Sequence, residues 1–442
     1  MKISVIGCGY LGAVHAACLA SLGHDVIGID TDAGRVAALR RGRAPFYEPG
    51  LDRLLATEAA AGRLRFSTDI GQAADATLHY LGVGTPQSAG SGAADMTYLD
   101  AAVESLIEVL PATGHPVVIA GKSTVPVGTA TRIAARIAQS AVAACLVWNP
   151  EFLREGTAIE DTLNPDRMVY GLPPDPEAAA DALRVLDQVF VTGGEQPHWP
   201  VVHTDYATAE LVKVAANAFL ATKVSFINAM ARLADASGGD VSELATAIGF
   251  DDRIGSKFLR AGVGYGGGCL PKDVRALIAR AEELGESATV GFLREVDQLN
   301  SDQRDRVLAQ AIDMLGGHAP GARVAVLGAS FKPGSDDLRD SPALAVATAL
   351  ASAGARVRIT DPQASDAVRS AHPELEAAGS AAETLAGADL VVLATEWPEY
   401  VALDPAQAGH WVQHRRILDG RNALDSHRWK AAGWQYRGVG RR

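Results

Sequence analysis

A glycine-rich turn close to the beginning of the chain constrains its fold more than any other feature. The turn reads GCGYLG at residues 7–12 and follows an apolar run rich in β-branched residues, KISVIG. Such a run predicts a buried strand, and the apolar residues 15–23 predict a helix after it. A second strand-like run, HDVIGID, ends at Asp30. Strand, helix and strand within about thirty residues predict the βαβ unit of a parallel sheet.

The spacing of the three glycines also predicts a ligand. Gly7 allows a tight turn, Gly9 lets the backbone approach a ligand closely, and Gly12 permits the helix to pack against the strand. The N-terminus of the helix would then hold a pyrophosphate group. Asp30 can accept hydrogen bonds from the adenosine ribose and would repel a 2′-phosphate, which predicts NAD; Arg35 leaves NADP open as a minor alternative. The other interpretation is a glycine-rich turn that binds no cofactor. It does not explain why the three glycines, the flanking strand and helix, and Asp30 occur together.

The rest of the chain predicts two further regions. Strand-like runs continue the first region at residues 78–84, 116–121 and 145–149. Residues 207–236 lack glycine and proline and predict one long helix, followed by more helix to about residue 315. A second α/β region has strand-like runs at residues 322–328, 356–362, 388–395 and 415–420. We therefore predict an α/β fold of two Rossmann-like doubly wound domains joined by a long central helical segment, with boundaries at 1–200, 201–315 and 316–442.

The second α/β region lacks the glycine fingerprint of the first. Its first strand ends at Gly328 and continues as ASFKP. This difference argues against a second dinucleotide site and for a different ligand.

Composition excludes several classes of function. The formal net charge is -12, so a nucleic acid partner is not expected. The four cysteines have neither CxxC nor Cys/His spacing, so we predict no metal site and a reducing, cytoplasmic compartment.

Residues 1–22 resemble a signal peptide superficially, but glycines interrupt the apolar run. No stretch reaches ~20 uninterrupted apolar residues, so no membrane span is expected.

Cys269 is the strongest candidate for a nucleophile. It lies in the stretch GYGGGCLPKD at residues 264–273, whose glycines let the backbone come close to a ligand. Pro271 suits the first turn of a helix, which would place Cys269 near a helix N-terminus. That location lowers the pKa of a thiol. The other three cysteines lie on predicted core elements and are expected to be buried apolar groups.

Two pairs of polar residues have helical spacing. Lys213 and Asn217 would share one face of the long helix, where they could stabilise an oxyanion or simply form a solvated stripe. Glu151 and Glu155 have the same spacing directly after a predicted strand. Carboxyl ends of strands are where ligands bind in open α/β sheets, so this pair could transfer protons, or it could only stabilise a helix N-terminus. Thr124 follows another strand and can face the same crevice.

A series of ordered motifs makes the chain resemble the UDP-glucose/GDP-mannose dehydrogenase family over nearly its whole length. The motifs are GCGYLG, FYEPGL (46–51), VGTP (83–86), KSTVPVGT (122–129), NPEFLREG (149–156), ELVKVAANAFLATKVSFIN (210–228), RIGSKFLRAGVGYGGGCLPKD (253–273), FKPGSDDLRDSP (331–342) and DGRN (419–422). The resemblance implies an N-terminal NAD domain, a central helical dimerisation segment and a C-terminal nucleotide-sugar domain.

The resemblance also implies the chemistry. The C6 alcohol of a nucleotide sugar would be oxidised to a carboxylate in two hydride steps, through a thiohemiacetal and a thioester on Cys269. Lys213 and Asn217 would hold the C6 oxygen, and Asp273 would orient Lys213 and water. Glu155, through water and Thr124, would handle protons and contact NAD. The implied catalytic residues are Cys269, Lys213, Asn217, Asp273, Glu155, Glu151 and Thr124.

The implied binding residues form two sets. The cofactor-binding set is Gly7, Gly9, Tyr10, Leu11, Gly12, Asp30, Arg35, Val83, Thr85, Pro86, Thr124, Glu155, Lys272 and Arg339. The substrate-binding set is Glu151, Phe152, Leu153, Lys213, Asn217, Arg253, Phe258, Leu259, Gly264, Gly266, Lys332 and Arg421, together with the rest of segment 258–264. Arg253 matches an arginine that enters the partner subunit's site, which implies a homodimer.

The motifs at residues 46–51 and 253–267 favour UDP-glucose, with GDP-mannose or a UDP-N-acetylhexosamine as alternatives. Departures from the family pattern, such as Gly268 in place of serine and Leu270 in place of phenylalanine, bear on fine specificity. A two-electron hydroxyacid dehydrogenase would use Lys213 and Asn217 but would need neither Cys269 nor the C-terminal region. A nucleotide-sensing module without turnover would not need a reactive cysteine.

Overall fold

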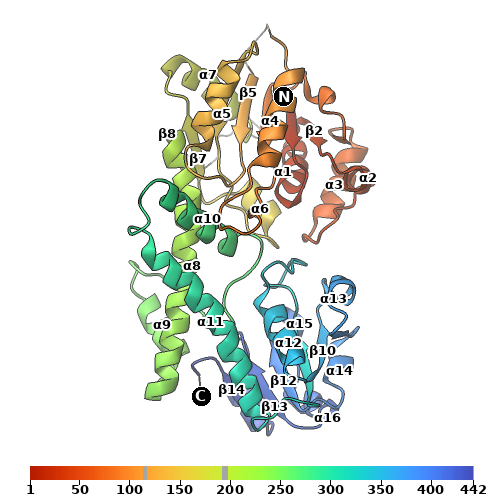
Figure 1. Cartoon of the computed structure of the whole chain (residues 1–442). Coiled ribbons are helices and arrows are strands. Elements are labelled where there is room, and N and C mark those ends of the chain that lie inside the picture. Colours follow the sequence, from red (N-terminus) through yellow and green to blue (C-terminus); the bar gives the residue numbers. More distant parts are fainter. Residues whose placement is uncertain (113–116, 192–197, 442) are drawn as a thin grey trace. The chain divides into compact units, whose positions relative to one another are not determined.

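The protein is described by a computed structural model that covers residues 1–112, 117–191 and 198–441. The chain divides into two compact units. The N-terminal unit comprises Met1–Ala216 and Ala279–Leu284, and the C-terminal unit comprises Asn217–Ile278 and Gly285–Arg442. Each unit contains one sheet, and Figure 1 labels several strands of each.

The sheet of the N-terminal unit has the strand order β3-β2-β1-β4-β5-β6-β7-β8. All neighbouring strands are parallel except β6 and β7. The first six strands have the order of a dinucleotide-binding sheet, whose ligand site lies at the carboxyl ends of the strands. The strands are β1 (Lys2–Ile6), β2 (Asp25–Ile29), β3 (Leu64–Ser67), β4 (Leu78–Leu81), β5 (Val117–Gly121), β6 (Ala144–Trp148), β7 (Met168–Leu172) and β8 (Val201–Asp205).

Helices cover both faces of this sheet because both faces of its central strands are apolar. In β5, Val118 and Ala120 point into one core, whereas Val117 and Ile119 point into the other. This alternation follows from the two-residue period of a strand. The helices wholly within this unit are α1 (Tyr10–Ser21), α2 (Ala33–Arg40), α3 (Leu51–Ala60), α4 (Thr97–Val109), α5 (Thr129–Ala138), α6 (Ala158–Leu163) and α7 (Pro176–Leu186), with the short 3₁₀ helix η1 (Ile70–Ala73).

The C-terminal unit repeats the same sheet plan with six strands, all parallel, in the order β11-β10-β9-β12-β13-β14. Its strands are β9 (Arg323–Leu327), β10 (Arg356–Thr360), β11 (Glu376–Ala377), β12 (Leu390–Leu393), β13 (Arg416–Asp419) and β14 (Gln435–Gly438). Its helices are α9 (Val241–Gly249), α11 (Gly291–Met314), α12 (Pro342–Ser352), α13 (Ser365–Ala371), α14 (Ala381–Leu385), α15 (Pro398–Val401), α16 (Pro405–Trp411) and α17 (Ser426–Ala431).

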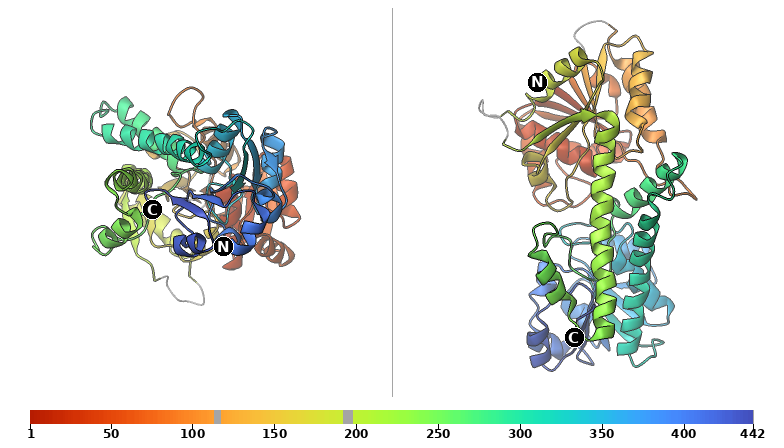
Figure 2. Two further views of the ribbon diagram at one scale, coloured as in Figure 1. Left: turned by 90° about the horizontal axis from the view of Figure 1, so that it is seen from below. Right: turned by 90° about the vertical axis from the view of Figure 1, so that its left-hand side faces the viewer.

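Two helices run from one unit into the other. They are α8 (Tyr206–Ser237) and α10 (Leu270–Glu283). The right-hand view of Figure 2 shows α8 as one continuous helix. By length and composition alone α8 could cross a membrane, but 44% of its most apolar window is buried inside the structure, as in a core helix.

The predicted fold class is confirmed. Every strand-like run of the sequence forms a strand, although Pro116 of the run 116–121 lies outside the described residues. The N-terminal apolar run forms β1 and α1, as the strand–turn–helix interpretation predicts. The structure adds strands that the sequence did not indicate, namely β3, β7, β8, β11 and β14. Residues 250–269, expected to be helical, form an irregular segment because glycines recur through it.

The two sheets share one detail at the end of their first strands. Gly7 and Gly328 both have positive φ, at 88° and 99°. The next amide donates in each case to the aspartate that follows the second strand, Asp30 or Asp361, at 2.8 Å. Asp361 is enclosed further by Ser330 and by the indole of Trp397. The second turn therefore keeps the backbone frame of the first but closes its carboxylate against other protein groups.

Candidate functional site

The glycine turn of the N-terminal unit has the packing that a dinucleotide needs. A Cβ on Gly12 would lie 1.8 Å from the carbonyl oxygen of Gly7, so only glycine lets α1 approach β1 here. A Cβ on Gly9 would meet no atom within 4 Å, so the space above this residue is open. Gly9 is the N-cap of α1, and no side chain caps the helix. The first amides of α1 therefore remain as donors for an anion, which fits a pyrophosphate group.

Asp30 is held by the backbone around it and by Arg35. Its carboxylate accepts the amide hydrogens of Cys8 at 2.8 Å and Asp32 at 2.9 Å. The Arg35 guanidinium donates to both carboxylate oxygens, at 3.0 and 2.9 Å. Because the charge of Arg35 is matched by Asp30, a 2′-phosphate would gain little from this arginine. The arrangement favours NAD over NADP.

Tyr10 links the glycine turn to the segment 149–156. Its hydroxyl donates to Glu48. Glu48 in turn accepts the amide hydrogens of Gly156 at 2.6 Å and Ala158 at 2.8 Å. Burial, followed by the contact with Glu48, raises the pKa of Tyr10. Tyr10 and Glu48 therefore hold in place the turn that contains Glu155.

The loops after β4 and β5 are fastened to each other. The Thr85 hydroxyl donates to the carbonyl of Thr124 at 2.7 Å, and the Ser123 hydroxyl donates to the carbonyl of Val83 at 2.6 Å. These loops follow adjacent parallel strands, so they share the ligand edge of the sheet. Pro86 continues the loop that follows β4, and Leu11 lies against Gly82 at the end of that strand.

Glu151 forms an ion pair that the sequence did not predict. One of its carboxylate oxygens lies 2.8 Å from the Lys122 ammonium, and the two side chains are 12% and 2% exposed. The other oxygen accepts the amide hydrogens of Phe152 at 2.8 Å and Leu153 at 3.2 Å. Burial alone would raise the pKa of Glu151, but the Lys122 ammonium and the other lowering contacts, which include the hydrogen bond from the Phe152 amide, together lower the pKa to about 2.

The helical spacing of Glu151 and Glu155 does not correspond to a helix in the structure. Residues 151–154 form no regular secondary structure and α6 begins only at Ala158, because Glu151 accepts from the amides that follow it and the chain turns at Gly156 (φ 82°). A carboxylate with a pKa near 2 is also a poor proton acceptor around neutral pH. The arrangement of Glu151 suits a residue that fixes the backbone of Phe152 and Leu153.

Lys213 lies in the first part of α8, which belongs to the N-terminal unit. Its ammonium is 5.5 Å from the ring centroid of Phe152, in cation–π geometry. The Arg167 guanidinium stacks on the same ring at 3.9 Å. Lys213 therefore lies beside the backbone segment that Glu151 and Lys122 fix.

In the C-terminal unit, Cys269 is exposed and directly precedes α10. The predicted position at a helix N-terminus is confirmed. Asp273, in the first turn of α10, is buried and accepts from Asn217 at 2.6 Å and from Lys272 at 2.7 Å. Asp273 thus fixes the Asn217 amide relative to the first turn of the cysteine-bearing helix. Its predicted role towards Lys213 stays a prediction.

The glycines before Cys269 allow the chain to pass close to other backbone segments. A Cβ on Gly266 would lie 2.3 Å from the carbonyl oxygen of Asp340. A Cβ on Gly268 would lie 2.3 Å from Cζ of Arg339, whose guanidinium also binds Asp337 at 2.7 Å. The glycine at position 268, directly before Cys269, therefore leaves room for the Arg339 guanidinium.

The C-terminal unit contains a pocket of about 440 Å³. Nine predicted substrate-binding residues line it: Phe258, Leu259, Arg260, Ala261, Gly262, Gly264, Gly266, Lys332 and Arg421. Four cationic side chains and a single carboxylate, Glu396, face it; the cations are Lys257, Arg260, Lys332 and Arg421. The pocket is therefore locally positive although the chain carries a formal charge of -12. A group with the charge of a diphosphate matches this environment.

Phe258 has a strained backbone at the wall of this pocket. Its φ is 65°, a value that bulky L-residues rarely adopt. Its side chain is nevertheless exposed. Strain of this kind persists where the surrounding structure enforces it, and it concentrates at ligand sites. The ring therefore lines the pocket rather than folding into the core.

Some lining residues carried no prediction. They are Val224, Ser256, Lys257, Tyr265, Leu270, Phe331 and Glu396. Lys122, the partner of Glu151 in the other unit, carried no role in the predictions either. Phe331 adjoins Lys332 in a motif, and Glu396 directly follows the strand-like run 388–395. A polar residue at the carboxyl end of a parallel strand is a signal that could have identified Glu396.

Comparison with known proteins matches three consecutive regions of the chain to the domains of one enzyme family. Residues 1–190, 207–302 and 325–426 match the UDP-glucose/GDP-mannose dehydrogenase family models for its NAD binding domain, central domain and UDP binding domain. The chain belongs to the UDP-glucose/GDP-mannose dehydrogenase family. The glycine turn and Asp30 lie in the NAD binding domain of this family. Glu396 and Arg421 lie in its UDP binding domain.

Individual relatives in the dehydrogenase family are similar over their full length. A UDP-glucose 6-dehydrogenase of Rhizobium meliloti (strain 1021) is 40% identical over 444 residues, with 100% of each chain covered. The structure of a UDP-glucose dehydrogenase from Pyrobaculum islandicum is 36% identical with a TM-score of 0.89, covering 100% of this chain and 98% of that chain. A UDP-D-ManNAc dehydrogenase structure from Pyrococcus horikoshii is 27% identical with a TM-score of 0.84, covering 100% and 99%.

Among the described residues, the side chain of Arg253 contacts a neighbour in its own loop. Arg253 is 88% exposed and its guanidinium binds Asp251 at 2.9 and 2.6 Å. No group of His, Cys, Asp or Glu side chains in residues 1–112, 117–191 and 198–441 could hold a metal ion.

Proposed function

We propose that this dehydrogenase oxidises the C6 alcohol of UDP-glucose to the carboxylate of UDP-glucuronate. The observation that carries the proposal is the exposed Cys269 at the start of α10, whose neighbour Leu270 lines the cationic pocket. The name and the 40% identity of the full-length Rhizobium meliloti relative support the choice of UDP-glucose.

NAD would be held at the open glycine turn. The amides at the start of α1 would bind its pyrophosphate, and Asp30 would accept from its adenosine ribose. Val83, Thr85, Pro86, Lys272 and Arg339 are the further residues proposed to contact it. When bound, NAD supplies the acceptor for both hydrides.

Cys269 supplies the covalent step. Its thiolate adds to C6 of the aldehyde formed in the first oxidation, which gives a thiohemiacetal. Loss of the second hydride from C6 leaves a thioester. Water then adds to the thioester carbonyl, and the thiolate leaves as the carboxylate forms. The position of Cys269 at the N-terminus of α10 favours the thiolate throughout this sequence.

Lys213 and Asn217 are proposed to stabilise the C6 oxygen as it gains negative charge. An ammonium and an amide donor suit an oxyanion. Asp273 fixes the Asn217 amide through the bond of 2.6 Å, so this donor is pre-oriented. We also propose that Asp273 orients Lys213 and the attacking water.

Proton transfer is proposed to involve Glu155 and Thr124 through water. The low pKa of Glu151, about 2, supports a different role for this second carboxylate. We propose that Glu151 positions Phe152 and Leu153 against the substrate rather than accepting a proton.

The active assembly is proposed to be a homodimer. The α8 helix carries Phe219, Phe226 and Leu233 at intervals of seven residues, and their side chains are 67%, 46% and 61% exposed. Residues seven apart on a helix share one face, so these three form an apolar stripe. The exposed Arg253 would then act in the partner subunit.

We place the enzyme in the cytoplasm, because its four cysteines suggest a reducing compartment.

The test is the amount of NADH formed per UDP-glucose consumed, with limiting UDP-glucose and excess NAD. We expect about two NADH per sugar, since the acid lies two hydride steps from the alcohol. Cys269→Ser should still bind UDP-glucose but lose turnover to the acid by on the order of a hundredfold or more.

One NADH per sugar, or a fully active Cys269→Ser, would overturn the thioester mechanism. No NADH from UDP-glucose, but turnover of GDP-mannose or a UDP-N-acetylhexosamine, would keep the chemistry and overturn the substrate assignment.

A further inference from the structure

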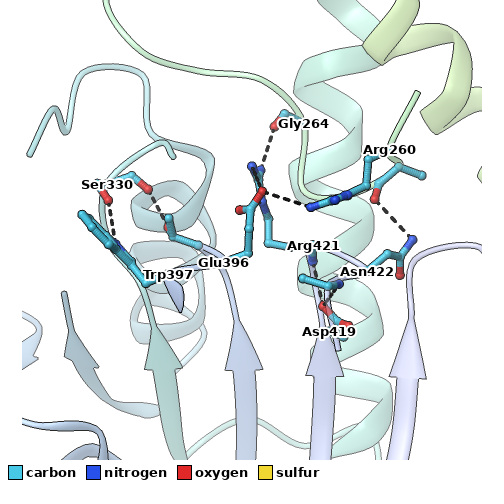
Figure 3. Close-up of polar contacts among 12 residues, drawn as sticks. Arg260, Gly264, Ser330, Glu396, Trp397, Asp419, Arg421 and Asn422 are labelled. Atoms are coloured by element: carbon cyan, nitrogen blue, oxygen red, sulfur yellow. Dashed lines mark hydrogen bonds and ion pairs between the residues drawn. The ribbon is translucent and has the colours of Figure 1, made fainter. Parts of the chain in front are cut away.

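The residues around Glu396 are arranged to aim one carboxylate into the cationic pocket. Glu396 follows β12 and lies between two anchored neighbours (Figure 3). The Thr395 hydroxyl donates to the carbonyl of Ser330 at 2.5 Å. The indole of Trp397 donates to Ser330 at 3.2 Å and to Asp361 at 3.1 Å. Both anchors lie on the side of β9 and β10, so Glu396 points the other way, towards the loop after β13.

Glu396 holds one edge of the Arg421 guanidinium. Nε of Arg421 donates to Oε2 at 2.6 Å, and Nη2 donates to Oε1 at 3.2 Å. This two-point contact fixes both the position and the plane of the guanidinium. The amide of Arg421 is fixed separately by Asp419 at 3.1 Å, so its backbone does not depend on Glu396.

Nη1 of Arg421 donates to the carbonyl of Gly264 at 3.4 Å, and this glycine lines the pocket. Together with the two bonds to Glu396, this leaves one hydrogen on Nη1 and one on Nη2 for a ligand. Arg260 approaches Oε1 of Glu396 at 3.6 Å. The Glu396 and Arg421 side chains are only 18% and 15% exposed, so water competes weakly for the pair. Burial alone would raise the pKa of Glu396, but Arg421 reverses this and the net pKa is lower than usual. Glu396 is therefore charged at neutral pH.

We propose that Glu396 is a positioning residue for nucleotide binding, which orients Arg421 so that its free edge meets the diphosphate or uridine part of the substrate. The inference rests on the proposed function in that it takes this pocket as the UDP subsite. Without Glu396, the arginine side chain would rotate among several conformations, and binding would have to restrict it again. The cost would appear in affinity for UDP and less in the rate of the chemical step, which takes place at C6.

The experiment measures binding of UDP alone to the full-length chain by titration calorimetry. Glu396→Gln keeps the shape but places an amide donor against the guanidinium, and we expect the Kd for UDP to rise roughly tenfold. KM for UDP-glucose should rise by a similar factor, with kcat changed less. Glu396→Asp keeps the charge but shortens the side chain, so it should also weaken UDP binding.

A double-mutant cycle identifies the residue through which Glu396 acts. In an Arg421→Met background, Glu396→Gln should cause no further loss of UDP affinity. Glu376→Gln is the matched control, because it removes a carboxylate from an exposed ion pair with Arg358 in the same unit. It should leave UDP binding unchanged. Unchanged NAD affinity and melting temperature would show that each variant is folded.

The outcomes separate this inference from the proposed function. Tighter or unchanged UDP binding by Glu396→Gln would overturn it, and so would wild-type affinity in Glu396→Asp. Additive losses in the double mutant would also overturn it, since Glu396 would then not act through Arg421. If the unmodified protein binds neither UDP nor UDP-glucose, the proposed function fails instead.

Discussion

Glu151 and Glu155 lie four residues apart in one sequence motif, but their environments in the structure differ. Glu151 is paired with Lys122 in a nearly dry site, whereas Glu155 occupies the turn held by Tyr10 and Glu48. Removing one partner of a buried ion pair leaves an uncompensated charge, which is far more costly than losing a surface pair. A residue's neighbours, rather than its type, therefore decide whether a carboxylate transfers protons or holds the backbone.

The low pKa of Glu151 makes a pH-dependent contribution to stability. Its pKa is about 2 in the folded chain, against an ordinary value of 4.5. The folded state binds its proton less readily, so the stabilisation is fully present above about pH 4.5 and is lost as the pH falls towards 2. The contribution is on the order of 3 kcal/mol. Urea unfolding midpoints of the wild type and Glu151→Gln, measured from pH 7 to pH 2, should converge in this range.

Glu376→Gln provides the control for that series, because Glu376 is an exposed carboxylate. Its midpoints should run parallel to those of the wild type. If the unfolding midpoints of Glu151→Gln also run parallel to those of the wild type, the ion pair of Glu151 with Lys122 does not determine how stability falls at low pH.

At the scale of elements, the start of α1 shows how one short turn combines packing and binding. Gly12 is required by the contact between helix and strand, whereas Gly9 faces open space. The two glycines therefore have separable roles, although the motif presents them as one pattern. Glycines have a structural and a binding consequence in the segment 250–269 as well. A helix was expected there, but the segment is irregular and part of it lines the pocket.

Alanine substitutions should separate the two glycines of the turn. Gly12→Ala would place a Cβ 1.8 Å from the Gly7 carbonyl oxygen, so the unit should lose roughly 1–3 kcal/mol or more of stability together with NAD binding. Gly9→Ala has a compatible φ of -66° and no clash. It should change stability by less than about 0.5 kcal/mol but weaken NAD binding, because the methyl group occupies the pyrophosphate position.

Melting temperatures and NAD titrations check both variants. Wild-type NAD affinity in Gly9→Ala would show that the cofactor does not approach this part of the backbone.

At the scale of the whole molecule, two sheets that share the order of six parallel strands belong to domains for different ligands, NAD in the first and UDP in the second. The first unit keeps an open glycine turn, while the second closes the equivalent aspartate with Ser330 and Trp397 and builds a cationic pocket instead. The apolar stripe of α8 is exposed in the single chain, which is unfavourable unless a partner covers it.

Charging this stripe should prevent dimer formation. Phe219→Glu together with Phe226→Glu would bury charge at the proposed interface, so sedimentation should show a monomer where the wild type is a dimer. Tyr98→Glu is the control, since Tyr98 is equally exposed but lies on α4. Turnover should fall in the monomer if Arg253 acts in the partner subunit. A dimer that survives the double substitution would place the interface elsewhere.

The sequence by itself determined the βαβ start, the two parallel sheets and the position of Cys269 at a helix N-terminus. These features depend on residues within one or two elements, such as the period of apolar residues in β5 or Pro271 after Cys269. Only the tertiary structure decided that Glu151 meets Lys122 and that Glu396 holds Arg421. The partners in these pairs are 29 and 25 residues apart. They meet because parallel strands bring the loops at their carboxyl ends to one edge of a sheet, where burial then sets the charge state and orientation of each group.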